Sequence, residues 1–151
     1  MGVVGVADTA ITEPDPNPNP NPRQTTMHKS RLCGFIIDCR TTDLEKDAAF
    51  WGRALGHEAL PPDPAHPDYV LLKTALGEPR IEVQRVEHQS RVHLDIETDD
   101  VEAETRRLEK LGARRIQQVR DWWVMEAPSG HRFCVVPAVA EDFSEKANAW
   151  K

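Results

Sequence analysis

The sequence predicts an α+β fold in which two βαβββ modules, in a pseudo-two-fold arrangement, form a curved-sheet cup with the helices outside. The main observation is a repeat: residues 32–60 and 92–119 both run through an apolar strand, an acidic helix start, an amphipathic helix, a Leu-Gly stop and a short strand. A second observation is that further short apolar runs follow each copy. A repeat of this length indicates two similar structural units, so any binding site is expected between them.

Matching signals bound the two predicted helices. Thr42 with Glu45, and Asp99 with Glu102, have the spacing of a capping box, in which each side chain satisfies a free backbone N–H of the first turn. Apolar residues then recur at helical spacing, and each helix ends where a glycine follows a leucine. Two unrelated helices with generic caps would give the same local signals, but the flanking strands match as well.

The remaining strands complete the modules, which span about residues 30–88 and 90–137. A proline-rich loop, PPDPAHPD, precedes the third strand of the first module and is expected to border a cleft. The other strands are predicted at residues 69–73, 80–86, 113–119, 122–126 and 132–136.

Both ends of the 151-residue chain lie outside these modules. Residues 1–29 are rich in Pro and Asn and offer little apolar surface to bury, so they are predicted to be a disordered tail. Translation could begin at Met1 or at Met27. Residues 138–151 are predicted to form a tail or a short helix.

Composition excludes several classes of function. The net charge is −6 and basic residues are dispersed among acidic ones, which argues against a nucleic-acid partner. The sequence has neither a signal peptide pattern nor an apolar run of membrane-spanning length, so a cytoplasmic protein without a membrane partner is expected. Three cysteines, an odd number without zinc-binding spacing, favour reduced thiols.

Three motifs together resemble one superfamily. They are DLEKDAAFWGRALG in the first helix, RVHLDIETDDVEAETRRLEKLGA at the module junction and APSGHRFCVVP at the last strand. The pattern is similar to the vicinal oxygen chelate proteins, which include glyoxalase I, bleomycin-resistance proteins, extradiol dioxygenases and fosfomycin-resistance proteins. The resemblance covers residues 30–137. It is closest to the glyoxalase-like subgroup that has Trp after Phe in the first helix and Phe-Cys in the last strand.

The resemblance implies a divalent metal at the base of the cup, held by about four His, Glu or Gln side chains from the first and last strands of each module. His93 matches the ligand at the start of the second module. Strand alternation places His93, Asp95 and Glu97 on one face, expected to point into the cup. The opposite face is expected to pack on the helix and carries Val92, Leu94 and Ile96.

The other ligand positions depart from the superfamily pattern. The first-module equivalent of His93 falls near Phe35 or Ile36, and Cys134 stands where the superfamily has a glutamate. Glu82 or Gln84 could supply the remaining ligand. The implied metal set is therefore incomplete, with His93 and Glu82 as its candidate members, and a divalent metal is an option rather than the expectation.

Several side chains are candidates for contacts with a ligand or for acid–base chemistry. One of Trp122 and Trp123 is expected to face the cup and to offer a stacking surface for a planar molecule. Asp95 and Glu97 beside His93 could act as a general acid–base group. The full candidate sets are His93, Asp95 and Glu97 for catalysis, and Glu82, Gln84, Trp122, Trp123 and Cys134 for ligand binding.

Three functional interpretations follow. The favoured one is a bleomycin-resistance-like protein that binds a small molecule in the cup without a complete metal site. The second is a metal-dependent lyase, isomerase or dioxygenase that uses His93 with Glu82 or Gln84. The third is a structural or regulatory module without a working site. The resemblance and the unpaired module edges also imply a homodimer.

Overall fold

The computed structural model describes residues 27–151. Residues 1–26, most of the predicted tail, lie outside the described part of the chain. The first strand begins at His28, slightly before the predicted start of the domain at residue 30. Within the described residues, no helix is both long and apolar enough to span a membrane.

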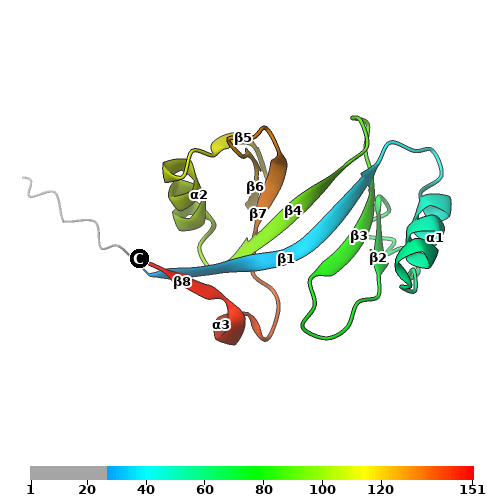
Figure 1. Ribbon diagram of the computed structural model, residues 1–151, viewed down its shortest axis with the longest axis horizontal. Helices are drawn as coiled ribbons and strands as arrows, with labels where there is room; N and C mark the ends of the chain where they lie inside the picture. The colour runs from blue at the N-terminus through cyan, green and yellow to red at the C-terminus, as the bar shows by residue number, and fades with distance from the viewer. Residues whose placement is uncertain (1–26) are drawn as a thin grey trace, which may run out of the picture.

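Residues 27–151 form an eight-stranded curved sheet with three helices (Figure 1), which confirms the predicted α+β class. The strand order is β2-β3-β1-β4-β7-β6-β5, and β8 pairs with the free side of β1 near its start. The first module comprises β1 (His28–Cys39), α1 (Leu44–Leu55), β2 (Tyr69–Leu72) and β3 (Arg80–Arg85). The second comprises β4 (Arg91–Thr98), α2 (Val101–Lys110), β5 (Arg114–Val119), β6 (Trp122–Glu126) and β7 (Arg132–Pro137).

The first module lacks one of the strands that the repeat predicts. Its second strand is reduced to an isolated bridge between Ala59 and Leu72. The prolines that follow in the loop have no N–H to donate to a neighbouring strand, so the ladder ends there. The module is thus βαββ with a residual bridge, whereas the second module is a full βαβββ unit.

The two modules meet along β1 and β4, which pair antiparallel at the centre of the sheet. The register places Ile36 opposite His93, Gly34 opposite Asp95 and Asp38 opposite Arg91. β3 then pairs parallel with β1, and β7 pairs parallel with β4, which repeats the same arrangement on either side. This central pair supplies the base of the cup.

Both helices begin one residue later than the capping pattern predicts. The N-cap residues are Asp43 and Asp100, whose side chains accept hydrogen bonds from the backbone N–H groups of Lys46 and Ala103. Thr42 and Asp99, the predicted caps, are each followed by an aspartate that caps equally well. The sequence pattern therefore did not determine which of the two neighbours is the N-cap. The predicted glycine end of the first helix is confirmed, because Gly56 is left-handed with φ of 75°.

One prediction about the central strands is wrong. Val92 and Leu94 do not pack on a helix, and they are 55% and 41% exposed. The reason is visible in Figure 1, where α1 and α2 cover the two ends of the sheet and leave its middle open. With Leu32 and Phe35 of β1, which are also exposed, these two residues form the outer apolar band.

The C-terminal segment is more ordered than a tail. It forms α3 (Phe143–Lys146) and the short strand β8 (Asn148–Trp150), which pairs with the first residues of β1. The Trp150 indole donates a hydrogen bond to Ser30 Oγ at 2.7 Å and lies under the Arg107 guanidinium at 3.9 Å. The two ends of the described chain are therefore held together against α2.

Candidate functional site

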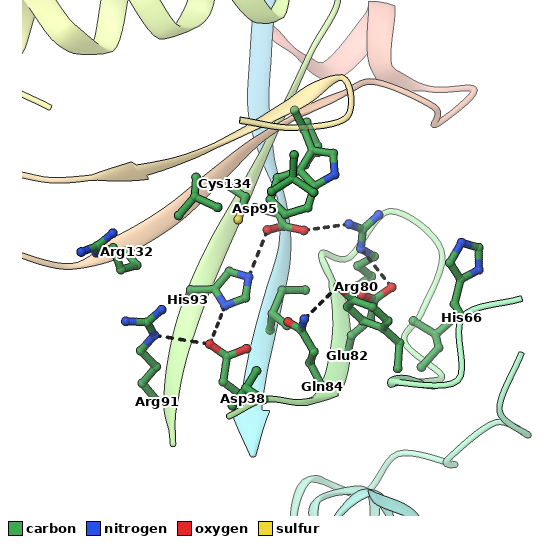
Figure 2. Close-up of a pocket in the computed structure, with 18 of the residues that line it drawn as sticks. Asp38, His66, Arg80, Glu82, Gln84, Arg91, His93, Asp95, Arg132 and Cys134 are labelled. Carbon is green, nitrogen blue, oxygen red and sulfur yellow. Dashed lines mark hydrogen bonds and ion pairs between the residues drawn. The ribbon is translucent and has the colours of Figure 1, made fainter. Parts of the chain in front are cut away.

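A cavity of about 760 Å³ lies inside the cup, between the two modules (Figure 2). The proline-rich loop borders it, as predicted, through Pro61, Asp63 and His66. Its walls are largely apolar and aromatic, and its rim is basic. The walls include Tyr69, Leu71, Trp122, Val124 and Val136, and the rim includes His88, Arg91, Arg120 and Arg132.

His93 lies at the base of the cavity between two carboxylates (Figure 2). Its Nδ1 atom is 2.9 Å from Asp38 Oδ2, and its Nε2 atom is 3.5 Å from Asp95 Oδ1. Burial alone would lower the pKa of His93, but the contacts with Asp38, Asp95 and Cys134 outweigh it and raise the pKa to about 11. Both ring nitrogens of His93 face carboxylates, an arrangement that favours the protonated ring.

The two aspartates that hold His93 occupy equivalent places in the repeat. Counting back five residues from the N-caps Asp43 and Asp100 gives Asp38 and Asp95. Both are almost fully buried, at 1% and 6% exposure. The sequence analysis selected Asp95 but not Asp38. Aligning the two copies of the repeat on the N-caps Asp43 and Asp100 would have shown that Asp38 is the equivalent of Asp95.

Arg80 is a second basic group at the base, and Gly34 makes room for it. Its Nη2 atom donates to Asp95 Oδ2 at 2.9 Å, and its Nε atom lies 3.4 Å from Glu82 Oε1. The side chain runs from β3 across β1 to reach β4, and a Cβ at Gly34 would be 3.1 Å from Arg80 Cγ. No motif pointed to Arg80, because its partner is 15 residues away on a strand that is not its neighbour.

Asp38 has further basic neighbours on the side facing the rim. Arg91 Nε lies 3.5 Å from Asp38 Oδ2, and His88 Nε2 lies 3.7 Å from the same oxygen. Burial raises the pKa of Glu82, and the Arg80 guanidinium opposes this shift. The base thus alternates acidic and basic groups from β1, β3 and β4.

Three more predicted residues line the cavity. Gln84 donates a hydrogen bond to Tyr69 Oη at 2.8 Å, which fixes both side chains on the wall. Trp122 also lines the cavity, so it is the cup-facing member of the tryptophan pair. Cys134 is a buried, free thiol at the base, and burial raises its pKa.

Two predicted residues lie elsewhere. Trp123 packs into the core under α2, with the Arg115 guanidinium 5.0 Å from its ring centre. Glu97 is buried but does not line the cavity, because it accepts a hydrogen bond from Arg31 Nε at 2.6 Å. Arg31 in turn binds Asp142, which joins this pair to the C-terminal segment.

The sheet register identifies the four positions that a pseudo-symmetric metal site would use. Ile36 lies opposite His93, Gln84 lies beside Asp38, and Cys134 lies beside Asp95. Ile36 offers no donor, Cys134 offers a soft thiol, and both nitrogens of His93 already face carboxylates, so Gln84 alone does not supply the several oxygen and nitrogen donors that a hard divalent cation requires. The residues present therefore do not fit the metal set that the resemblance implies.

A different group of potential ligands does come together. One ligand atom each from His93, Asp95 and Cys134 lie within 4.8 Å of one another, and Glu82 does not belong to this group. The thiol and imidazole are softer donors than those of the superfamily set. In the structure, however, the imidazole nitrogens already face Asp38 and Asp95.

Paired modules around a central cup are the architecture that the sequence motifs indicate. The resemblance that the sequence motifs carry is confirmed. The chain belongs to the glyoxalase-like domain family, whose model matches residues 34–136. A search of curated proteins found no match.

Solved structures share this fold at low sequence identity. The Mn(II)-bound glyoxalase from Novosphingobium aromaticivorans aligns with a TM-score of 0.54 and 16% identity, over 76% of this chain and 40% of that one. A hypothetical protein from Bacillus halodurans aligns with a TM-score of 0.53 and 12% identity, over 74% and 96%. The methylmalonyl-CoA epimerase from Mycobacterium tuberculosis aligns with a TM-score of 0.51 and 14% identity, over 73% and 89%. These likenesses concern the fold.

Proposed function

We propose that this protein binds a small molecule in the cup and does so without a chelated metal. The observation that carries the proposal is the open cavity whose central histidine is held between two aspartates. Its volume of about 760 Å³ is within the range of cavities that take drug-sized ligands. The cytoplasmic location expected from the sequence is part of the same proposal.

The contacts of His93 support a metal-free cup. Its Nδ1 and Nε2 atoms both face carboxylates, and a proton held in such a contact takes up the lone pair that a metal would need. Glu82, the other candidate ligand from the sequence, is paired with Arg80 instead.

The test is the metal content of tag-free protein purified without chelators, measured beside a His93→Ala variant. We expect a metal-to-protein ratio far below one in both proteins. Near-stoichiometric Fe, Mn, Ni or Zn that disappears in the variant would contradict the proposal. It would favour the alternative of a metal-dependent lyase, isomerase or dioxygenase.

That alternative has one specific observation in its favour. The group formed by His93, Asp95 and Cys134 offers three donors, and Asp38 contacts the other nitrogen of the same imidazole. A carboxylate behind a histidine is a common way to orient a metal ligand. The metal measurement separates this enzyme from the metal-free binding protein.

A homodimer, expected from the sequence, is also a proposal, and the outer apolar band gives it a location. The band lies on the central strands β1 and β4, on the side away from the cup. Because these strands straddle the pseudo-two-fold axis, a second copy placed back to back would bury the same residues on both sides. We expect the wild type to elute as a dimer at micromolar concentration and Val92→Lys as a monomer, with Val139→Lys as the control. A monomeric wild type would contradict this arrangement.

A further inference from the structure

Two arginines lie together at the edge of the cup where β4 and β7 begin. Arg91 is the first residue of β4, and Arg132 is the first residue of β7. The two strands run parallel with Leu94 beside Phe133, so both arginines are at the same end of the sheet. Both line the cavity, and Figure 2 shows their side chains on the same side of His93. We call this end of the cavity the arginine edge.

The carboxylate that faces Arg91 is shared among several basic groups. Asp38 Oδ2 lies 2.9 Å from His93 Nδ1 and 3.5 Å from Arg91 Nε. The same oxygen lies 3.7 Å from His88 Nε2. The Arg91 guanidinium also approaches the His88 ring, with Nη2 3.4 Å from Nε2. One carboxylate thus serves three basic groups, and its shortest contact is with His93.

The carboxylate that faces Arg132 is shared as well. Arg132 Nη2 lies 3.1 Å from Glu126 Oε2, and the other oxygen of Glu126 accepts a hydrogen bond from Arg114. The Arg132 and Arg91 side chains are 30% and 43% exposed, so a bound molecule can reach them. A guanidinium has five N–H donors, and one carboxylate contact leaves most of them available.

The other charges of the lining favour an anion over a cation. Four carboxylates, four arginines and three histidines line the cavity, so basic groups are in excess. Arg120 is one of them and makes no ion pair within residues 27–151. A cation would have to compete for carboxylates that already have partners, whereas an anion meets available N–H groups. The existing pairs are Asp38–His93, Asp63–His66, Glu82–Arg80 and Asp95–Arg80.

The walls next to the arginine edge are apolar and aromatic. Arg132 pairs with Glu126 of β6, and Val124 and Trp122 follow at alternate positions on the same wall of the cavity. At about 3.3 Å per residue, the four residues from Glu126 to Trp122 extend over about 13 Å. Tyr69 adds a second aromatic side chain to the lining. Such walls favour a flat apolar body that extends away from the charged edge.

We propose that the cup binds a flat apolar or aromatic carboxylate whose charged head lies at the arginine edge. Arg91 and Arg132 donate hydrogen bonds to the carboxylate, whose two oxygens match the fork of N–H groups on a guanidinium. The ring lies against Val124 and extends toward Trp122. This inference rests on the proposed function, since it names the class of ligand for the same cavity.

The test compares 2-naphthoate, 2-naphthamide and 2-naphthamidine, which share one ring system and carry an anionic, a neutral and a cationic head. Ligand-observed NMR at submillimolar concentrations gives the three dissociation constants. We expect naphthoate to bind about tenfold more tightly than either of the others. Preference for the amide or the amidine, or equal binding, would overturn the inference and leave the small-molecule function standing. If none of the three binds, both are overturned.

Variants locate the carboxylate. Arg132→Gln and Arg91→Gln are each expected to weaken naphthoate binding about fivefold and to leave naphthamide binding unchanged. Arg53→Gln is the matched control, because Arg53 is an exposed arginine of α1 outside the cavity, and it should bind naphthoate as the wild type does.

Two results with the folded variants would overturn the placement of the head. One is unchanged naphthoate binding in both, and the other is an equal loss for naphthoate and naphthamide, which would indicate an altered cavity rather than a lost contact. The wild-type comparison of the three probes does not depend on either variant folding.

Discussion

The two modules carry equivalent helices that are anchored in different ways. α1 packs through Leu44 and Ala48 on an apolar layer of β1, β2 and β3. α2 buries a carboxylate, Glu104, which accepts hydrogen bonds from His28, Ser30 and Arg107. The equivalent residue of α1, Asp47, takes part in no such network. Thus α1 covers an apolar core in the first module, whereas α2 holds the two ends of the described segment, through His28 and Ser30 at one end and Trp150 at the other.

The base of the cup shows the same kind of divergence. Asp38 and Asp95 are equivalent and keep the same residue, but Ile36 and His93 are equivalent and differ. Gly34 and Arg91 are also equivalent. Gly34 leaves space for the Arg80 side chain, whereas Arg91 is itself a basic group beside Asp38. The two carboxylates of the site therefore come from positions that the modules share, and the basic His93 and Arg91 come from positions at which they differ.

The difference between the helices predicts the largest effect. Glu104→Gln should lower the free energy of unfolding by about 4 kcal/mol, because it leaves buried donors and the Arg107 charge without their partner. Burial opposes ionisation of Glu104, but the hydrogen bonds from Arg107, His28 and Ser30 prevail and lower its pKa. Urea denaturation measures the change.

Asp47→Asn is the control for this comparison, since it alters the equivalent position of α1. It should change the free energy of unfolding by less than about 0.5 kcal/mol. Equal losses in the two variants would show that the helices are anchored alike.

The raised pKa of His93 predicts a pH dependence that Ile36, its equivalent, cannot have. A group whose pKa rises on folding stabilises the protein fully below its unfolded pKa, and that contribution is lost as the pH approaches the folded value. For His93 these limits are its ordinary 6.5 and about 11. The difference in unfolding free energy between wild type and His93→Gln should therefore fall by about 3 kcal/mol from pH 7 to pH 9.5.

Taking this difference cancels the titration of groups that both proteins share. The groups that face His93 are Asp38, Asp95 and the Cys134 thiol, and Arg80 and Arg91 stand behind the two aspartates. A difference that stays constant over this range would mean that His93 is neutral in the folded protein.

The smallest effect is expected at Gly34. Gly34→Ala places a methyl group 3.1 Å from Arg80 Cγ, and the flexible side chain must shift. We expect a loss of about 1 kcal/mol in stability, mainly from the weakened Arg80–Asp95 contact. Urea denaturation measures this loss. Wild-type stability in the variant would indicate that the Arg80 side chain does not need the space beside Gly34.

The sequence was sufficient for the architecture because local patterns repeat there. Strand alternation, helix spacing and the glycine ends located nearly every element, and the alternation correctly turned His93 toward the cup. The error at Val92 and Leu94 has a physical cause: an apolar strand face predicts burial, but two short helices cannot cover a sheet of this length.

The site was only partly predictable, for a different reason. Arg80 and Asp38 meet the residues of β4 through sheet register, which no local pattern encodes. Trp122 and Trp123 could be separated only once the facing strands were known. Asp38 was accessible in principle, through alignment of the repeat on Asp43 and Asp100 rather than on the residues before them.

The most direct test of the central claim is the protonation state of His93 in the metal-free protein at pH 8, read from the ¹⁵N signals of its ring. The signal is assigned by its loss in His93→Gln. The account predicts an imidazolium with protons on both nitrogens, held by Asp38 and Asp95. A neutral ring with one free nitrogen would contradict it and would make His93 available to a metal.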